Sequence, residues 1–220
     1  MVVIPALDAG FTVGDVVRAS LAQLPAVVVV NDGSTDATPE AAAAAGAVVL
    51  HHPHNLGKGA ALRTGFRHAL ENGFDAVITV DADGQHLPSE IPKFVRAWRE
   101  TGADLIIGDR SHLFGGMLPR RRNANMFSAW AISKCAGRRV TDSQSGFRLY
   151  SASLIREVSM DANGFAAESE IIVRAGRLGK RILSIPIELG FVNGISTSHY
   201  RPLLDTLRIA GVVARTRIFG

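Results

Sequence analysis

Two carboxylates two residues apart follow an apolar run, in the segment Asp81-Ala82-Asp83-Gly84-Gln85-His86. The run itself, residues 76–80, is typical of a buried strand, so the pair would stand at the strand's carboxyl end. Mg²⁺ prefers one or two carboxylates together with water and phosphate oxygens, and a ribose can share the same pair. We therefore expect a cation site here, with Gln85 as a further oxygen ligand and His86 as a loop residue.

A further carboxylate, Asp32, ends another apolar run and directly precedes the turn that begins at Gly33. A carboxylate at this place can accept hydrogen bonds from the ring N–H groups of a uracil or guanine base. Asp36, in contrast, fits the capping of the helix that follows the turn. We therefore expect Asp32 to contact a nucleotide base.

A glycine-flanked lysine opens a later predicted helix, in the segment Asn55-Leu56-Gly57-Lys58-Gly59. The glycines allow close backbone approach, and Lys58 could either meet a phosphate at the positive helix end or be an ordinary surface lysine. The histidines at positions 51, 52 and 54 lack metal-ligand spacing and are interpreted as loop residues. Neither this segment nor residues 5–10 have the glycine spacing of a P-loop or a dinucleotide fingerprint, which argues against both nucleotide-binding classes.

These residues must be positioned by elements that alternate along the chain. Strands are predicted near residues 2–4, 26–30, 47–50, 76–80 and 105–107, and helices near 13–23, 38–45, 59–72 and 89–100. This alternation predicts an α/β fold with a mostly parallel central sheet flanked by helices on both faces. The polar residues that follow the strands then gather at the carboxyl edge, where ligands bind in such sheets.

The second half of the chain has a different pattern. Residues 110–122 contain two glycines, Pro119 and a basic triplet, and they are predicted to form a long loop. Helices near 123–135, 167–178 and 203–217 and strands near 147–150 and 182–188 follow. We expect a single domain over residues 1–200 and an amphipathic helix over 201–220.

Composition narrows the class of protein. The chain has 220 residues, 47% hydrophobic and 20% charged, with a net charge of +4. This weak positive field does not favour nucleic acid as a partner, and nothing in the sequence indicates an oligomeric state. The single cysteine, Cys135, excludes an internal disulfide and a cysteine-cluster metal site. Because no run reaches the ~18 apolar residues of a membrane span and no signal segment precedes the first strand, we expect a cytoplasmic protein, peripheral at the inner face of the membrane.

Five ordered segments match a known family. They are Pro5-Ala6-Leu7-Asp8, Val30-Asn31-Asp32-Gly33-Ser34, Asn55-Leu56-Gly57-Lys58-Gly59, Asp81-Ala82-Asp83-Gly84-Gln85 and Asp142-Ser143-Gln144-Ser145-Gly146-Phe147-Arg148. Over residues 1–200 the chain resembles the family 2 glycosyltransferases of the GT-A fold. Within them it is most similar to the branch of dolichyl-phosphate mannose synthases and polyprenyl-phosphate glucosyltransferases.

The resemblance implies a role for each matched residue on the donor side. The nucleotide base and ribose would contact Pro5, Leu7, Val30 and Asp32. The ribose and diphosphate would contact Asp81 and Ala82, and Mg²⁺ or Mn²⁺ would be held by Asp83 and Gln85. The family often has Tyr-Asn-Glu where Leu7-Asp8-Ala9 stands, so the base contact from the first strand is weaker here.

On the acceptor side, the resemblance implies that Arg110 lies near the diphosphate and that Arg122 meets an acceptor phosphate. Asp142 lies in the acceptor motif, and the following segment is matched by Gly164, Phe165 and Glu168. The family's late arginine and Ser-Lys pair, which grip phosphates, are replaced by residues 194–199. That role would pass to Ser198 and His199, or to Arg201.

The expected activity is transfer of a sugar, with inversion, from a nucleotide-diphosphate sugar (GDP-mannose or a UDP-hexose) to a polyprenyl-phosphate lipid. The metal, held by Asp83, and Arg110 would neutralise the departing diphosphate. A hydroxyl of a polysaccharide, lipid or protein is the alternative acceptor, and it would require a general base. Asp142 is the candidate base in that case and an orienting group otherwise. A nucleotidyltransferase and a catalytically silent binding module are further alternatives.

Contact with an anionic membrane is expected from two basic features. The loop carries Arg120, Arg121 and Arg122, and helical spacing in the last helix groups Arg201, Asp205, Arg208 and Arg215 near one face. These arginines could be solvated on a helix that simply packs on the domain. They could instead hold the protein against anionic headgroups, where a polyprenyl phosphate would present its phosphate to Arg122.

Overall fold

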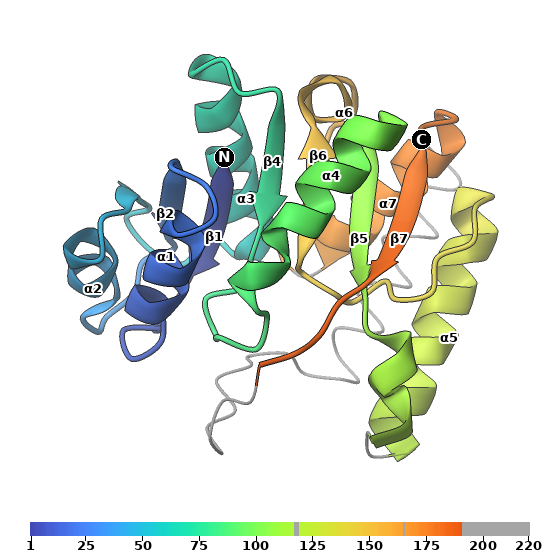
Figure 1. Ribbon diagram of the computed structural model, residues 1–220, viewed down its shortest axis with the longest axis horizontal. Coiled ribbons are helices and arrows are strands. Elements are labelled where there is room, and N and C mark those ends of the chain that lie inside the picture. Colours follow the sequence, from blue (N-terminus) through green and yellow to red (C-terminus); the bar gives the residue numbers. More distant parts are fainter. Residues whose placement is uncertain (117–118, 165, 191–220) are drawn as a thin grey trace.

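A seven-stranded sheet runs through the computed structural model, which describes residues 1–116, 119–164 and 166–190 (Figure 1). The strands lie in the order β3-β2-β1-β4-β6-β5-β7. Their bounds are Val2–Ala6 (β1), Val27–Asn31 (β2), Val48–His51 (β3), Ala76–Thr79 (β4), Leu105–Asp109 (β5), Arg148–Ser151 (β6) and Ile182–Pro186 (β7). Strand β6 is antiparallel to both of its neighbours, and the other pairs are parallel. The expected mostly parallel sheet is confirmed.

Helices cover both faces of this sheet, as the alternation of elements predicts. Their bounds are Val13–Leu21 (α1), Thr38–Ala44 (α2), Lys58–Glu71 (α3), Ile91–Thr101 (α4), Pro119–Ala136 (α5), Ala152–Glu157 (α6) and Ala166–Arg177 (α7). Two short 3₁₀ helices, Pro88–Glu90 (η1) and Ser111–Gly116 (η2), precede α4 and α5. Figure 1 shows α1 and α4 in front of the sheet and α3 and α7 behind it.

The unbroken valine run of β2 illustrates how the sheet is held. Val28 and Val30 face a core that is shared with α3, α5 and α7, whereas Val27 and Val29 face a second core under α1, α2 and α4. Alternate residues of a strand point to opposite faces, so a strand that is covered on both sides must be apolar throughout. The two cores together fix the strand ends that carry the polar residues.

The region after β5 differs from the expected long loop. Residues 111–116 form η2, and α5 begins at Pro119, so the basic triplet lies in the first turns of a helix. A proline is well tolerated in the first turn because its missing N–H would have no helical partner there. The short helix α6 was also not predicted. Its N-cap is Ser151, whose hydroxyl accepts from the backbone N–H of Leu154 at 3.1 Å.

Among the described residues, no helix combines the length and apolar character needed to cross a bilayer. The helix expected over 201–220, and the boundary that it would form with the domain, lie outside the described residues.

Candidate active site

The loops that follow β1, β2, β4 and β5 meet at the carboxyl edge of the sheet, the lower edge in Figure 1. The β1 and β2 loops are joined by the backbone N–H of Asp8, which donates to Ser34 Oγ at 3.0 Å, and by the carboxylate of Asp8, which accepts from Thr35 N at 2.8 Å. The hydroxyl of Thr12 donates to Ala82 O at 2.6 Å and so ties the β1 loop to the β4 loop. These bonds bring distant parts of the sequence into one rigid rim.

Asp32 is almost completely buried at the end of β2. Its carboxylate accepts from the backbone N–H groups of Leu56 at 2.9 Å and Gly57 at 2.8 Å, and His52 Nδ1 lies 2.6 Å from its Oδ1. The other ring nitrogen of His52 lies 2.9 Å from Thr64 Oγ1. Asp32 therefore holds the loop before α3 in place, and Oδ2, whose only partner among the described residues is the N–H of Gly57, has room for a further hydrogen bond.

Lys58 reaches across the site to two carboxylates. Its Nζ lies 2.6 Å from Asp81 Oδ1 and 3.0 Å from Glu168 Oε2. Burial alone would lower the pKa of Lys58, but the charges of Asp81 and Glu168 outweigh it, so this pKa is raised. For Asp81, burial alone would raise the pKa, but the nearby Lys58 ammonium outweighs burial and lowers this pKa to about 2. The Lys58–Asp81 pair is therefore charged at neutral pH.

The N-terminal end of α3 is covered by another part of the chain. The backbone N–H of Gly59 donates to Asn163 O at 2.5 Å, so the loop before α7 lies against the first turn of α3. Lys58 contributes to the site through its side chain instead. The close backbone approach expected from the flanking glycines is confirmed.

Asp81 is also approached by the loop before β6. A methyl group at Gly146 would lie 2.6 Å from Asp81 Oδ1, so any side chain at this position would displace the carboxylate. On the other side, His86 Nδ1 lies 3.6 Å from Asp81 Oδ2, and neither ring nitrogen of this buried histidine makes a hydrogen bond within the described residues. Burial lowers the pKa of His86 to about 4 and keeps the ring neutral at neutral pH.

Asp83 behaves in the opposite way from Asp81. Its Oδ1 accepts from the backbone N–H of Gln85 at 3.0 Å, and burial together with the negative charge of Asp81 raises its pKa. A carboxylate that is destabilised by a neighbouring negative charge is one that a bound cation would stabilise. Within the described residues, no three His, Cys, Asp or Glu side chains group tightly enough to hold a metal alone. The residues fit a Mg²⁺-like ion that takes most of its ligands from water and phosphate oxygens.

A buried two-point ion pair stands at the end of β5. Arg110 Nε lies 2.7 Å from Asp142 Oδ2, Nη2 lies 3.1 Å from Oδ1, and the Arg110 backbone N–H also donates to Oδ2 at 3.2 Å. Asp142 further accepts from Gln144 N and Ser145 N. Although burial opposes it, the charge of Arg110 lowers the pKa of Asp142. The geometry therefore favours an orienting role for Asp142 over that of a base.

Arg148, at the start of β6, holds the loop that contains Asp142 in place. Its guanidinium is fully buried and donates to the carbonyl oxygens of Ser143 at 2.8 Å, Ser145 at 2.6 Å and Glu168 at 2.6 Å. This one side chain thereby joins the loop that contains Asp142 to the start of α7. Sequence reasoning gave Arg148 and His52 no part in the site. Nothing in the sequence marks the backbone oxygens that Arg148 binds, and the partners of His52 are 20 and 12 residues away.

The remaining expected residues are placed as follows. Val30 is fully buried in the core against α3, and its expected contact with the nucleotide stays a prediction. Pro5 and Leu7 are partly exposed at the end of β1, and Arg122 is partly exposed near the start of α5. Ser198, His199 and Arg201 lie outside the described residues.

Comparison with known proteins adds three findings. The family model described as "Glycosyl transferase family 2" matches residues 1–162. An undecaprenyl-phosphate mannosyltransferase of Micrococcus luteus is 36% identical over 173 residues, which cover 73% of this chain and 70% of the relative. A polyprenol monophosphomannose synthase of Mycolicibacterium smegmatis is 29% identical over 211 residues, covering 86% and 77%.

A solved structure shares the fold. The glucosyl-3-phosphoglycerate synthase of Mycobacterium tuberculosis, in complex with Mn²⁺, uridine diphosphate and phosphoglyceric acid, is similar with a TM-score of 0.72 and 22% identity. The similarity covers 100% of this chain and 78% of that one. The expected GT-A architecture, with its mostly parallel sheet between helices, is confirmed.

Proposed function

Because the chain belongs to glycosyl transferase family 2, we propose that it transfers a sugar from a nucleotide-diphosphate sugar to a polyprenyl phosphate, with inversion at the sugar carbon. Two relatives whose names specify a polyprenyl-phosphate acceptor and mannose support this acceptor class and make GDP-mannose the first donor to test. A UDP-hexose stays an alternative donor, because Asp32 can accept from guanine or uracil.

The observation that carries the choice of acceptor is the state of Asp142. A hydroxyl acceptor requires a group that removes its proton, whereas a phosphate is already anionic near neutral pH. Asp142 has a lowered pKa and uses both oxygens for Arg110 and the backbone. It is therefore a poor base and a good anchor for Arg110. This favours a phosphate acceptor over the competing hydroxyl.

The chain's own residues would act on the donor as follows. Arg110 pairs with Asp142 through Nε and Nη2, and Nη1, which has no partner among the described residues, would meet the diphosphate as negative charge develops on it. Lys58 keeps Asp81 ionised and oriented towards the ribose and diphosphate. Asp83 and Gln85 would hold Mg²⁺ or Mn²⁺, which when bound stabilises the charge of the leaving diphosphate. Direct attack by the acceptor phosphate inverts the sugar carbon.

We also propose peripheral contact with an anionic membrane, because a polyprenyl phosphate keeps its tail in the bilayer. The test of the proposed function is incubation with radiolabelled GDP-mannose or UDP-glucose, Mn²⁺ and a polyprenyl phosphate. Label that moves into the organic phase, and that is lost on addition of EDTA, supports the proposal. Release of pyrophosphate would favour a nucleotidyltransferase, and binding of oligonucleotides without any turnover would favour the silent binding module.

A further inference from the structure

The solvent face of α5 carries large apolar side chains where polar ones would be expected. Met126, Phe127 and Trp130 are exposed by 57%, 58% and 58%, and the rings of Phe127 and Trp130 lie 5.7 Å apart. They project from positions i, i+1 and i+4, so they share one side of the helix. We call these three residues the α5 apolar patch. A contiguous exposed patch of this kind marks an interaction surface.

The opposite side of α5 is already occupied. Ala129, Ile132 and Ala136 are buried in the domain, the last two in the core that α5 shares with α7. The hydroxyl groups of Ser128 and Ser143 lie 3.1 Å apart, which joins the helix to the loop that contains Asp142. The α5 apolar patch therefore lies on the side of the helix that faces away from this core, and the helix that bears it is tied directly to the loop that contains Asp142.

The charge around the patch indicates what it meets. Between positions 110 and 141 the sequence contains seven basic residues and no Asp or Glu; the seven are Arg110, Arg120, Arg121, Arg122, Lys134, Arg138 and Arg139. Of these, Arg110 is buried and paired with Asp142. Arg120 lies at one end of the exposed side of α5, Lys134 lies at the other, and both are exposed. An aromatic centre between basic ends complements an interface of apolar chains and anionic headgroups.

We infer that the α5 apolar patch, with Arg120 and Lys134, docks the protein on an anionic lipid bilayer. The inference rests on the proposed function for its purpose, because docking through α5 would bring the Arg110–Asp142 pair to the headgroup layer where a lipid phosphate lies. The membrane contact that was expected from a basic loop is thereby assigned to a helix. The patch adds an apolar contact that basic residues alone cannot supply.

The test is flotation of the full-length chain with vesicles of phosphatidylcholine, with or without phosphatidylglycerol. The wild-type chain should float with the anionic vesicles at low salt, and less so at about 1 M salt, where charges are screened beyond about 3 Å. In the double variant Phe127→Ser, Trp130→Ser, the fraction of protein bound to the vesicles should fall about tenfold or more. The double variant Arg120→Ser, Lys134→Ser should lose the salt-sensitive part of binding.

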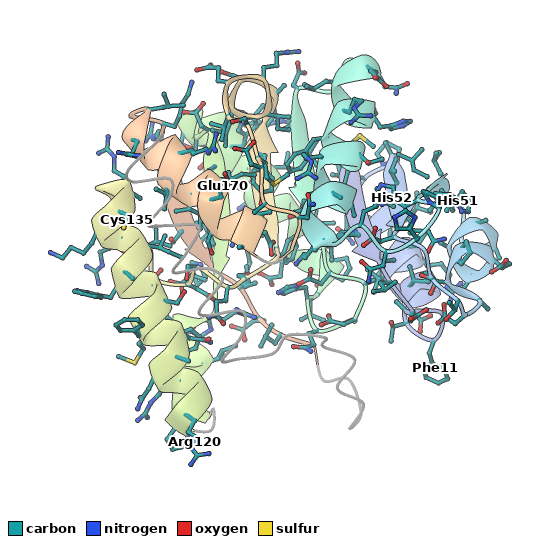
Figure 2. All side chains as sticks on the ribbon, turned by 180° about the vertical axis from the view of Figure 1, so that it is seen from behind. Phe11, His51, His52, Arg120, Cys135 and Glu170 are labelled. Carbon is teal, nitrogen blue, oxygen red and sulfur yellow. The ribbon has the colours of Figure 1, made fainter. Side chains whose placement is uncertain are left out.

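Phe11→Ser is the matched control. Phe11 is exposed by 86%, more than either aromatic of the patch, and Figure 2 shows it on the opposite side of the molecule from α5 and Arg120. It should float as the wild-type chain does. All these side chains are exposed, so the unfolding midpoint should be nearly unchanged in each variant. The inference would be overturned if the Phe127→Ser, Trp130→Ser variant floated as well as the wild-type chain. It would also be overturned if Phe11→Ser reduced the bound fraction as much as that variant does.

Two further measurements separate the remaining outcomes. If sedimentation shows that the wild-type chain is a dimer and the Phe127, Trp130 variant is a monomer, the patch joins two copies and the lipid inference is wrong. Transfer to a water-soluble short-chain prenyl phosphate should be equal in the wild-type chain and this variant. Flotation as predicted without transfer to any prenyl phosphate would leave docking supported and contradict the proposed function.

Discussion

Arg110 and Asp142 are held together by two parallel contacts, of 2.7 Å and 3.1 Å, inside the protein. They lie 32 residues apart in the sequence, one after β5 and the other before β6. Because β6 runs antiparallel to β5, the residues that precede β6 return to the carboxyl edge where β5 ends. The reversed strand thus brings the loop that contains Asp142 into the candidate active site.

Replacing Asp142 tests its orienting role. Asp142→Asn should destabilise the chain by about 3–5 kcal/mol, because it leaves the Arg110 charge buried without its partner. Transfer should fall sharply, while the shape of its pH profile should not change, since no base is lost. The double variant Arg110→Met, Asp142→Leu should recover much of the stability but none of the activity. Thermal unfolding and transfer rates check both statements, and loss of a titrating limb in Asp142→Asn would instead identify a base.

Asp83 is the carboxylate that we expect to hold the metal. Asp83→Ala should abolish Mn²⁺-dependent transfer and leave the free energy of unfolding within about 1 kcal/mol of the wild-type value, because removing it relieves repulsion from Asp81. Asp15→Ala, which removes an exposed aspartate from α1, is the control and should be active. Mn²⁺ binding, measured by calorimetry in the presence of a nucleoside diphosphate, provides a second readout. Undiminished metal binding by the Asp83 variant would refute this assignment.

His86 predicts a pH dependence of stability. Its pKa is lowered from 6.5 to about 4 by burial, so the unfolded chain binds a proton over this range that the folded chain does not. Stability is therefore lost as the pH falls from 6.5 to 4, by about 3 kcal/mol from this group. His86→Leu should flatten the curve in this window and cost little at pH 7, because the ring nitrogens make no hydrogen bonds among the described residues.

The exposed His54 offers the control for this experiment. His54→Leu should keep the wild-type slope when unfolding by urea is followed between pH 4 and pH 7. Equal slopes in all three proteins would show that His86 is not held neutral by burial.

Gly146 tests the packing against Asp81. Gly146→Ala places a methyl group 2.6 Å from Asp81 Oδ1, so the carboxylate must move away from its position beside Lys58. We expect transfer to fall about tenfold and stability to fall by about 1–3 kcal/mol. Gly116→Ala meets no atom of the described residues within 4 Å and should be close to the wild-type chain in both respects. Equal activity of the two variants would mean that the position of Asp81 is not critical.

Much of the fold follows from local pattern. The valine run of β2 and the short apolar runs of β1, β4 and β5 are recognisable because strands covered on both faces must be apolar. The carboxylates are recognisable because each of them comes directly after one of these apolar runs. The start of α5 was placed four residues late, because a proline beside glycines resembles a loop as closely as it resembles a first helical turn.

The partners of the site residues could not be predicted in the same way. Lys58 meets Asp81 and Glu168, which are 23 and 110 residues further along the chain, and Arg148 binds carbonyl oxygens that have no sequence signature. Such contacts depend on how the elements are packed.

In the proposed reaction a lipid phosphate, and not a hydroxyl, receives the sugar. The most direct measurement offers the wild-type chain, with Mn²⁺ and labelled donor, a polyprenyl phosphate and the matching polyprenol of equal chain length. We predict transfer to the phosphate alone, at a rate that Asp142→Asn lowers without changing its pH profile. Transfer to the polyprenol at a comparable rate would contradict the account.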